Sequence, residues 1–354
     1  HMLGKHEGGN ERYIKNLALN LIKYNQKKHF IKIVVQNDYF SNQNVFSKNN
    51  LLKINFRNDF YRIFYFLPIK FRTEKCGIIH STYIAPYSNN IKTVITIHDL
   101  SFKRYPDFYS LRERLIFNYL LPISLLRAKA IIVPSQFTKN ELINFYPEYK
   151  DKTFVVYEGA DKCFYKISKN IAKKEIREKY RIDGPVLLVF NSKNPKKNVD
   201  IVIKAYKKMI HWQPKLKLVI IGVKDNLAVR DLGNIYIFNN ISDFDLNLFY
   251  NGCEIFINPS IYEGFNLSII EALKIKTIVM AADIVVNREL YENSILYFNP
   301  HNAHEIEKIV QKTMKTLVIT RRRVVNQYKK IAYKFDWGGN TRKMLAIYHR
   351  VNQK

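Results

Sequence analysis

The sequence is poor in cysteine and in acidic residues, and it lacks long apolar segments. Its three cysteines, Cys76, Cys163 and Cys253, stand apart without CxxC spacing, which argues against a disulfide framework or a zinc site and fits a reducing compartment. No apolar run approaches the roughly 20 residues that span a bilayer, so we expect no integral membrane protein. No signal peptide is apparent, but the opening His1-Met2 is typical of a cloning remnant and leaves a targeting segment open.

The scarcity of acidic residues makes the charge balance extreme. The 354 residues include 58 Lys and Arg against 30 Asp and Glu, a formal net charge of +28. Such an excess indicates an anionic partner, and nucleic acid, anionic lipid headgroups and phosphorylated small molecules all qualify. Compositional drift is the other explanation, because the chain is crowded with Lys, Asn, Ile, Tyr and Phe. With 47% hydrophobic residues the chain is too apolar for disorder.

The chain alternates strand-like apolar runs with amphipathic helical stretches, which is the pattern of parallel α/β sheets. In the first half this predicts a helix at 11–24 and strands at 31–36, 77–80, 93–97, 130–134 and 153–157. In the second half it predicts helices at 170–180, 199–211 and 267–274, and strands at 186–190, 216–222, 235–238, 255–258 and 277–281. A last helix at 340–352 is expected after a break at 337–339.

These two halves predict two doubly wound, Rossmann-like domains at 1–163 and 164–336. The segment 337–354 is expected to pack back on the first domain as a helix. Ligands of open α/β sheets bind beyond the carboxyl ends of the strands, so we expect two such domains to face a shared interdomain cleft.

The strongest local motif is PSIYEGFNLSIIE at residues 259–271, where a strand ends, a turn follows and an apolar helix begins. Gly264 lets a ligand approach the backbone, and the N-terminus of a helix favours an anion. Glu263 before the helix and Glu271 inside it can face one ligand, and sugar hydroxyls suit carboxylates placed beside a phosphate site. The alternative is that Glu263 caps the helix and Glu271 lies on a solvated face.

The stretch from Glu263 to Glu271 resembles the Glu-x7-Glu motif of the GT-B glycosyltransferases of family 4. Four more segments resemble that family in the same order: GGNERY at 8–13, VITIHDLSF at 94–102 followed by YP at 105–106, VPSQFT at 133–138, and NSKNPKKN at 191–198. Together they span almost the whole chain. The resemblance implies an α/β protein of the GT-B fold, with two Rossmann-like domains facing a cleft.

The resemblance also implies roles for individual residues. Lys197 would neutralise charge on the leaving nucleoside diphosphate, Glu263 would hold hydroxyls of the transferred sugar, and His98 would reach the reaction centre from the first domain. The implied donor-binding residues are Lys193 and Lys196 at the diphosphate, the backbone of Gly264, Phe265, Asn266 and Leu267, Glu271 at the ribose, and Gly8 and Gly9 near the phosphates. The alternatives are that the lysines form a solvated loop and that His98 is structural.

The sequence departs from the family at several positions. Asn191 stands where the family has glycine, and Lys196 replaces an arginine, which removes a bidentate phosphate contact. The common NGVD segment reads EGAD at 158–161. The strand that normally precedes the loop at Gly8 is absent from this sequence, so we expect the first sheet to lack its N-terminal strand.

The function implied is that of a retaining glycosyltransferase that needs no metal or other cofactor. It would move a hexose, with GDP-mannose the favoured donor, to a saccharide or polyprenyl-diphosphate-linked acceptor, as in bacterial lipopolysaccharide, O-antigen or capsule synthesis. Two other classes stay open: a catalytically degenerate scaffold of the same fold, and a nucleic-acid-binding protein. The second lacks any recognisable nucleic-acid-binding signature, so nucleic acid is not an expected partner.

A cytoplasmic location is expected, with a peripheral contact at the inner face of the membrane as an open alternative. The basic helical stretch 12–28 carries Leu17, Leu21 and Ile22 on one side and several lysines on the other. Such a helix suits anionic headgroups. It equally suits an ordinary core helix with a solvated face.

Overall fold

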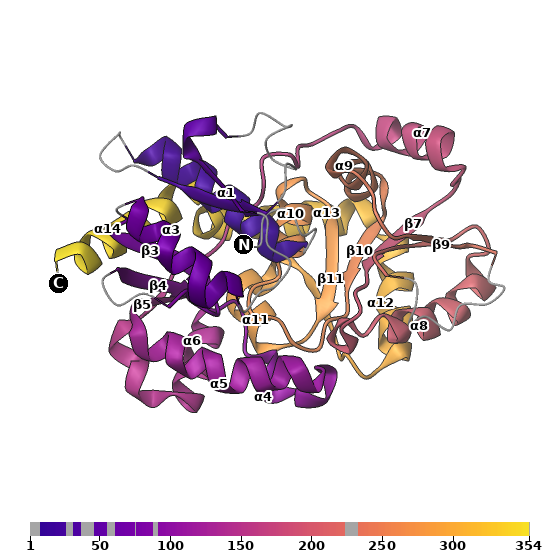
Figure 1. Ribbon diagram of the computed structural model, residues 1–354. Coiled ribbons are helices and arrows are strands. Elements are labelled where there is room, and N and C mark those ends of the chain that lie inside the picture. The colour runs from indigo at the N-terminus through magenta and orange to yellow at the C-terminus, as the bar shows by residue number, and fades with distance from the viewer. Residues whose placement is uncertain are drawn as a thin grey trace. The chain divides into compact units, whose positions relative to one another are not determined.

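The computed structural model describes residues 8–25, 31–36, 46–54, 61–74, 76–87, 91–223 and 233–353. The chain divides into two compact units (Figure 1). The first unit comprises residues 1–106, 110–159 and 335–354, and the second comprises 107–109 and 160–334. Short turns η3 (Pro106–Phe108) and η7 (Ala332–Phe335) lie where the chain passes between the units.

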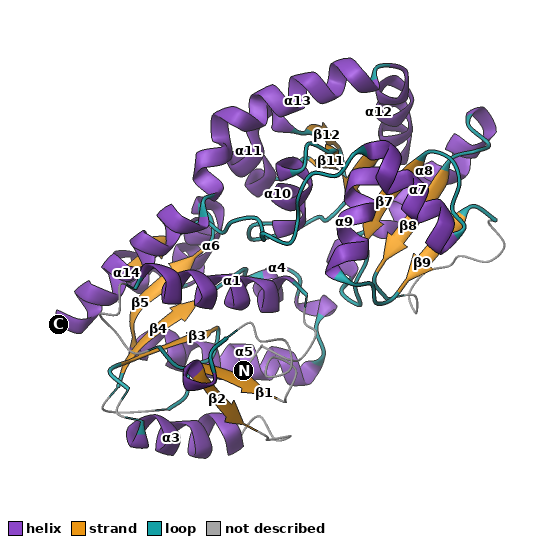
Figure 2. Cartoon of the chain, turned by 90° about the horizontal axis from the view of Figure 1, so that it is seen from above, coloured by secondary structure: helices purple, strands orange, loops and turns teal. Residues whose placement is uncertain are grey.

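The first unit consists of parallel strands and covering helices (Figure 2). Its strands are β1 (Ile33–Gln36), β2 (Leu51–Ile54), β3 (Ile78–Thr82), β4 (Lys92–Thr96), β5 (Ala128–Val133) and β6 (Thr153–Val155). Its helices are α1 (Gly9–Tyr24), α3 (Leu67–Thr73), α4 (Ser101–Arg104), α5 (Leu111–Arg127), α6 (Gln136–Phe145) and α14 (Trp337–Gln353), with short turns η1 (Lys48–Asn50), η2 (Arg62–Phe66) and η4 (Pro147–Lys152). Strands β3, β4, β5 and β6 form one parallel sheet in that order, and β1 pairs with β2 in parallel.

Strand β5 shows why the sequence pattern identified this sheet. Its β-branched run Ile131, Ile132 and Val133 is buried, as expected for a strand covered on both faces. The chain then enters α6, and the Ser135 side chain accepts a hydrogen bond from the backbone N–H of Thr138 at 3.0 Å. Ser135 is therefore the N-cap residue of α6.

The last helix begins earlier than predicted. Trp337 and the two glycines after it form the first turn of α14 rather than a break before it. The turn is possible because the Asp336 carboxylate accepts a hydrogen bond from the backbone N–H of Gly339 at 2.6 Å, as an N-cap residue does. Helix α14 packs against α1, β4 and β5, all in the first unit.

The second unit is one six-stranded parallel sheet with helices around it (Figure 2). Its strands are β7 (Val186–Phe190), β8 (Lys217–Ile221), β9 (Ile235–Phe238), β10 (Ile255–Asn258), β11 (Ile278–Ala282) and β12 (Leu296–Phe298). Its helices are α7 (Lys169–Tyr180), α8 (Val199–Trp212), α9 (Asp243–Gly252), α10 (Leu267–Lys274), α11 (Val285–Tyr291), α12 (Ala303–Lys315) and α13 (Leu317–Ile331), with short turns η5 (Pro195–Lys197) and η6 (Glu292–Ser294).

The strand order of this sheet is β12-β11-β10-β7-β8-β9. Counted from β7, that order is 6-5-4-1-2-3, the doubly wound Rossmann arrangement. The direction of winding reverses between β7 and β10, which are hydrogen-bonded neighbours. Ligands of such sheets bind beyond the carboxyl ends of the strands at this reversal. The topology therefore predicts a ligand site at the loops after β7 and β10.

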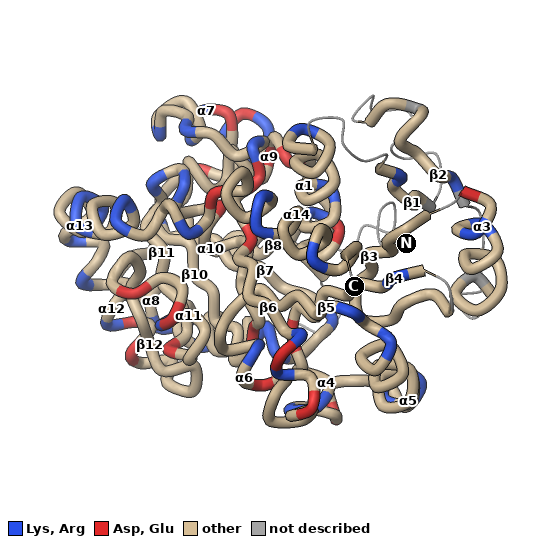
Figure 3. The backbone as a smooth tube through the Cα atoms, turned by 90° about the vertical axis from the view of Figure 1, so that its left-hand side faces the viewer, with Lys and Arg blue, Asp and Glu red and all other residues tan. Residues whose placement is uncertain are grey.

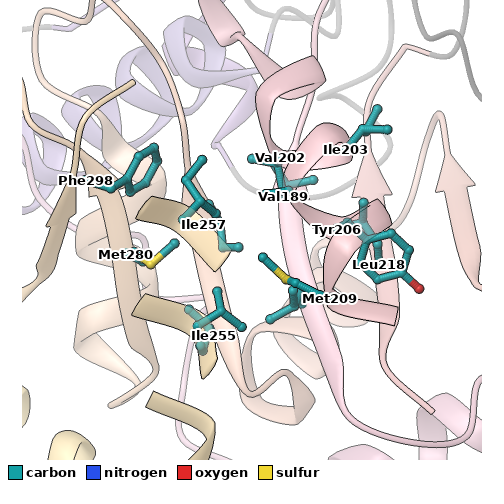
Figure 4. Close-up of a cluster of buried hydrophobic side chains, with 14 of the residues drawn as sticks. Val189, Val202, Ile203, Tyr206, Met209, Leu218, Ile255, Ile257, Met280 and Phe298 are labelled. Atoms are coloured by element: carbon teal, nitrogen blue, oxygen red, sulfur yellow. The ribbon is translucent and has the colours of Figure 1, made fainter. Parts of the chain in front are cut away.

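One apolar core holds these strands in place. Ile255, Ile257 and Met280 of the sheet pack with Val202 and Met209 of α8, and all five are fully buried (Figure 4). Each such side chain contributes about 1.5–3 kcal/mol to folding. The two loops after β7 and β10 therefore extend from a rigid base.

Candidate functional site

Two loops meet at the winding reversal of the second unit. Residues 191–198 follow β7 and residues 259–266 follow β10. The backbone N–H of Ile261 donates to the carbonyl of Lys196 at 2.9 Å. The Asn198 amide, at a residue with φ of 50°, donates to the carbonyls of Pro259 at 3.3 Å and Pro300 at 2.8 Å. The loops thus form one connected surface.

A Lys–Glu ion pair joins the same two loops. The Lys197 ammonium donates to the Glu263 carboxylate at 2.6 Å. The Lys197 side chain is 25% exposed and that of Glu263 is 11% exposed, so Lys197 keeps contact with solvent while Glu263 is nearly buried. The structure therefore brings together two of the three residues predicted to act in catalysis.

The loop before α10 is closed at its base by two asparagines. Asn258 ends β10 and Asn266 precedes α10, and their buried side-chain amides exchange two hydrogen bonds of 3.0 Å each. Asn266 has a φ of 77°, and the Tyr291 hydroxyl contacts the carbonyls of Phe265 and Asn266 at 2.7 and 2.9 Å. These contacts fix the backbone from Gly264 to Leu267, which is the stretch predicted to bind phosphate. Asn258 and Tyr291 were not among the site residues predicted from the sequence.

Glu271 is buried inside α10, with 1% of its surface exposed. This excludes the interpretation in which it lies on a solvated face. The Tyr250 hydroxyl of α9 lies 3.2 Å from a Glu271 carboxylate oxygen and contacts the carbonyl of Ser268 at the same distance. Glu271 is therefore held by a tyrosine on the neighbouring helix.

The remaining predicted lysines, Lys193 and Lys196, lie in the loop after β7. The backbone N–H of Lys196 donates to the Asn194 side chain at 3.0 Å, which begins the turn η5. Asn191, where the family has glycine, donates its side-chain amide to the carbonyl of Val223 after β8 at 2.7 Å. The departure at Asn191 thus adds a link between the ends of β7 and β8.

In the first unit, His98 follows β4 and meets Glu158, which follows β6. His98 Nδ1 lies 3.1 Å from the Glu158 carboxylate. Both residues are buried, and the Tyr13 ring of α1 packs edge-on against the imidazole with centroids 4.6 Å apart. The imidazole Nε2 is buried and has no hydrogen-bond partner among the described residues.

The contact with Glu158 assigns the two imidazole nitrogens of His98. A carboxylate only accepts hydrogen bonds, so the proton of a neutral imidazole resides on Nδ1 and Nε2 keeps its lone pair. In the sequence, Glu158 stood out only as a departure from the NGVD pattern. The signal for its role is its place immediately after a parallel strand of the sheet that carries His98.

A second histidine lies beside this group. His80 of β3 contacts the Tyr348 hydroxyl of α14 through Nδ1 and Thr96 Oγ1 of β4 through Nε2, the latter at 2.7 Å. The Tyr13 hydroxyl lies 3.1 Å from the same Thr96 oxygen. Burial, with a smaller contribution from the nearby His98, lowers the pKa of His80 to about 3. His80 is therefore neutral at physiological pH.

Gly8 and Gly9 begin α1 in the first unit. Gly8 has a φ of 62° and precedes the helix, and no described atom lies within 4 Å of the position that a Cβ would occupy there. The residues before Gly8 lie outside the described part of the chain. Gly8, Gly9 and His98 thus belong to the first unit, and all other predicted site residues belong to the second.

The burial of the apolar residues of α1 decides between the two interpretations of this basic helix, which are contact with lipid headgroups and packing in the core. Leu17 and Leu21 of α1 are 7% and 8% exposed, so the apolar side that was a candidate for headgroup contact packs inside the first unit. Helix α1 is therefore a core helix. Its predicted continuation through Lys27 and Lys28 lies outside the described residues.

Among the described residues, no three His, Cys, Asp or Glu side chains gather in a way that suits a metal ion. None of the described helices combines the length and the apolar composition needed to cross a bilayer.

The chain matches two family models. Residues 7–162 match the model described as Glycosyltransferase Family 4, and residues 172–331 match Glycosyl transferases group 1. The boundary between the matches falls close to the boundary between the two structural units, at Gly159.

Curated relatives show similarity at modest identity. The chain is 29% identical over 232 residues to the O-antigen chain mannosyltransferase RfbU of Salmonella typhimurium, which covers 63% of this chain and 60% of that protein. It is 25% identical over 279 residues to the serotype-specific mannosyltransferase WbdA of Escherichia coli, covering 74% of this chain and 34% of that protein. The chain therefore spans less than two thirds of either relative.

Solved structures share the fold over nearly the full length. Sucrose-phosphate synthase from Thermosynechococcus elongatus aligns with a TM-score of 0.76 and 17% identity, covering 97% of this chain and 94% of that one. Anabaena Alr3699/HepE in complex with UDP-glucose aligns with a TM-score of 0.76 and 16% identity, covering 99% and 98%. At these identities the likeness defines the fold, which is GT-B, as the sequence predicted.

Proposed function

Because this chain belongs to the family 4, group 1 glycosyltransferases, we propose that it is a retaining hexosyltransferase that uses a nucleotide-sugar donor. The observation that carries the proposal is the Lys197–Glu263 pair at the winding reversal of the second sheet. A cation for diphosphate and a carboxylate for hydroxyl groups meet where an α/β sheet binds its ligand.

The donor we favour is GDP-mannose. Its support is the similarity to proteins named as O-antigen and serotype-specific mannosyltransferases. A structural relative binds UDP-glucose, so a uridine donor is the competing outcome of any test. We propose a saccharide acceptor, attached to polyprenyl diphosphate, and a place at the inner face of the cytoplasmic membrane.

In the proposed reaction, Lys197 binds an oxygen of the donor diphosphate and stabilises the charge that develops as the glycosidic bond breaks. Glu263, which holds Lys197 in this structure, binds hydroxyl groups of the transferred sugar. The acceptor oxygen attacks the same face of an oxocarbenium-like sugar that the diphosphate leaves. The departing phosphate takes the acceptor proton, so the step needs no protein nucleophile and no metal.

The test combines ligand binding with product analysis. Thermal shift against GDP, UDP, dTDP and ADP and their sugars should show one preferred base, since a ligand at about 100 times its Kd adds about 2.7 kcal/mol to stability. NMR of the product formed from GDP-mannose should show a retained α-anomer. An inverted product refutes the mechanism. Absence of both binding and transfer indicates the degenerate scaffold instead.

The two glutamates should differ in their effects. Glu263→Ala is expected to reduce kcat more than Glu271→Ala, because the sugar lies nearer the breaking bond than the ribose. Glu271→Ala should act mainly on the KM for the donor. Steady-state kinetics with varied donor measure both values, and equal or reversed effects on kcat contradict the proposed placement.

A further inference from the structure

Helix α5 exposes an apolar stripe to solvent. Leu111, Leu115, Tyr119, Ile123 and Leu126 are 70, 47, 68, 46 and 69% exposed. Their spacing of four and three residues places them along one side of the helix. The opposite side is also apolar and packs in the core, where Leu121 and Leu125 are fully buried. We call the five exposed residues the α5 stripe.

A second exposed stripe runs from just before η2 into α3. Tyr61 before η2, Tyr65 in η2 and Ile69 in α3 are 50, 55 and 64% exposed, and their spacing of four again places them on one side. Between the stripes runs the segment that contains Ala85 and Tyr87. Its residues contact α5 through Ser124 and η2 through the carbonyl of Ile63 (3.1 and 3.4 Å).

The aromatic ring of Tyr87 completes the connection. Tyr87 is 46% exposed, and the Arg127 guanidinium at the end of α5 lies 4.1 Å from its ring centroid. The α5 stripe, Tyr87 and the second stripe thus lie on elements of the first unit that contact one another, and together they form an exposed apolar surface. Monomeric soluble proteins seldom expose large contiguous apolar surfaces without an interaction partner.

Basic residues surround this surface. Arg112, Arg127 and Lys129 lie on or next to α5, and the Lys152 ammonium donates to the carbonyls of Leu125 and Ala128 at 2.8 and 2.9 Å. Helix α3 carries Lys70 and Arg72, and Figure 3 marks basic positions on both helices. The acid of α5, Glu113, is held in a capping box with Ser110 at the start of the helix.

We propose that this surface docks on an anionic lipid bilayer, with the α5 stripe in the boundary between headgroups and acyl chains. Exposed aliphatic and tyrosine side chains enter that boundary, and flanking Arg and Lys side chains contact the phosphates. The proposal rests on the proposed function, because a polyprenyl-diphosphate-linked acceptor resides in such a membrane. This surface, and not helix α1, is the part of the first unit that we propose to contact lipid, because the apolar side of α1 is buried.

A second copy of the chain fits this surface less well. Self-association would bring one basic rim against another in a protein of net charge +28, and like charges brought together oppose binding. An anionic bilayer supplies the opposite charge to the same rim. Charge complementarity therefore selects lipid as the occupant.

The test compares two doubly substituted variants of the full chain in vesicle flotation. Tyr119→Asp/Leu126→Asp places two acids in the α5 stripe. The matched control, Val318→Asp/Ile319→Asp, makes the same change at two residues of α13 that are 71 and 72% exposed. The vesicles are phosphatidylcholine alone and phosphatidylcholine with phosphatidylglycerol, each at low and high salt.

We expect the wild type to bind the phosphatidylglycerol vesicles and to release as salt rises. The α5 variant should bind at least about tenfold more weakly, because two apolar groups are lost and two like charges are added, whereas the α13 variant should bind as the wild type does. Equal binding by the α5 variant, an equal loss in the α13 variant, or no binding by the wild type overturns the proposal.

Two further measurements separate this proposal from the proposed function. Light scattering of both proteins detects a dimer, and a dimer that the α5 substitutions dissociate would identify a second copy as the occupant and overturn lipid docking. Thermal shift with the preferred nucleoside diphosphate should be the same for the α5 variant and the wild type. Vesicle binding without any nucleotide response would contradict the transferase and leave the docking surface intact.

Discussion

At the scale of single residues, Lys197 is the side chain on which the proposed chemistry most depends. Its ammonium is held at 2.6 Å from Glu263, so it is positioned before a donor binds. Lys197→Ala should lower kcat/KM by a factor equivalent to about 2.7–4 kcal/mol, the usual cost of losing one preorganised charge-stabilising donor. Lys204→Ala, on an exposed side of α8, is the matched control and should leave the kinetics unchanged. Near-normal turnover in Lys197→Ala removes this residue from the site.

Glu158 is expected to act through His98, as a positioning residue. Glu158→Leu leaves the buried Nδ1–H of His98 without its acceptor, and such a loss costs about 1–3 kcal/mol. We therefore expect kcat to fall by about tenfold or more. Glu158→Gln keeps an acceptor oxygen and should retain more activity than the leucine variant. Nucleoside diphosphate binding in thermal shift should stay unchanged in both, and equal activity of the two variants contradicts an orienting role.

At the scale of elements, the second-unit site depends on loops fixed at the ends of strands. Gly222 directly follows β8 with a φ of 128°, and a Cβ there would lie 2.0 Å from the carbonyl oxygen of Asn191. Gly222→Ala should therefore lower the free energy of unfolding by at least about 2 kcal/mol and displace the lysine loop. Gly233→Ala, where no described atom lies within 4 Å of the added Cβ, is the control. Urea unfolding and donor affinity measure the two effects, and wild-type values for Gly222→Ala contradict this account.

Helix α5 shows why some elements were not predicted. Its apolar residues lie on both sides, buried on one and exposed on the other, so it lacks the single apolar side that identifies an amphipathic helix. Helix α10 and strand β10, by contrast, were predicted with the bounds that the structure has. A short, continuous apolar strand followed by a helix is a strong local pattern.

At the scale of the whole molecule, both ends of the described chain belong to the first unit. The Tyr348 hydroxyl of α14 contacts His80 of β3, and the Lys92 ammonium of β4 donates to the carbonyl of Asn352 at 2.7 Å. The C-terminal helix is thus tied to the first sheet by polar contacts as well as by packing on α1. The protonation of His80 should therefore influence the stability of the first unit.

The pH dependence of stability follows from the direction in which folding shifts the pKa of His80. The pKa of His80 is lowered from 6.5 to about 3 on folding. Below pH 6.5, therefore, His80 is protonated in the unfolded chain while it stays neutral in the folded chain. Stability is fully present above pH 6.5 and is lost as pH falls toward 3. At pH 5 this shift corresponds to a loss of at most about 2 kcal/mol of unfolding free energy. The partial exposure of His80 makes the actual loss smaller than this limit.

Urea unfolding between pH 7 and pH 4 measures this dependence. His80→Gln should reduce the slope of the unfolding free energy against pH, whatever its effect at neutral pH. His211→Gln, at the exposed end of α8, should keep the wild-type slope. An unchanged slope in His80→Gln would show that another group causes the loss of stability at acidic pH.

The sequence alone determined the features that depend on local pattern. These are the parallel α/β class, most of the buried strands, and the motif around Glu263 and Lys197, because period, turn residues and short-range spacing are encoded within a few residues of one another. The tertiary structure decided which distant residues meet. Glu158 reached His98 across 60 residues of chain, and Asn258, Tyr291 and Tyr250 support the motif. Such pairs arise from strand order and packing. Packing also decided that the apolar side of α1 is buried in the core whereas the α5 stripe is exposed to solvent.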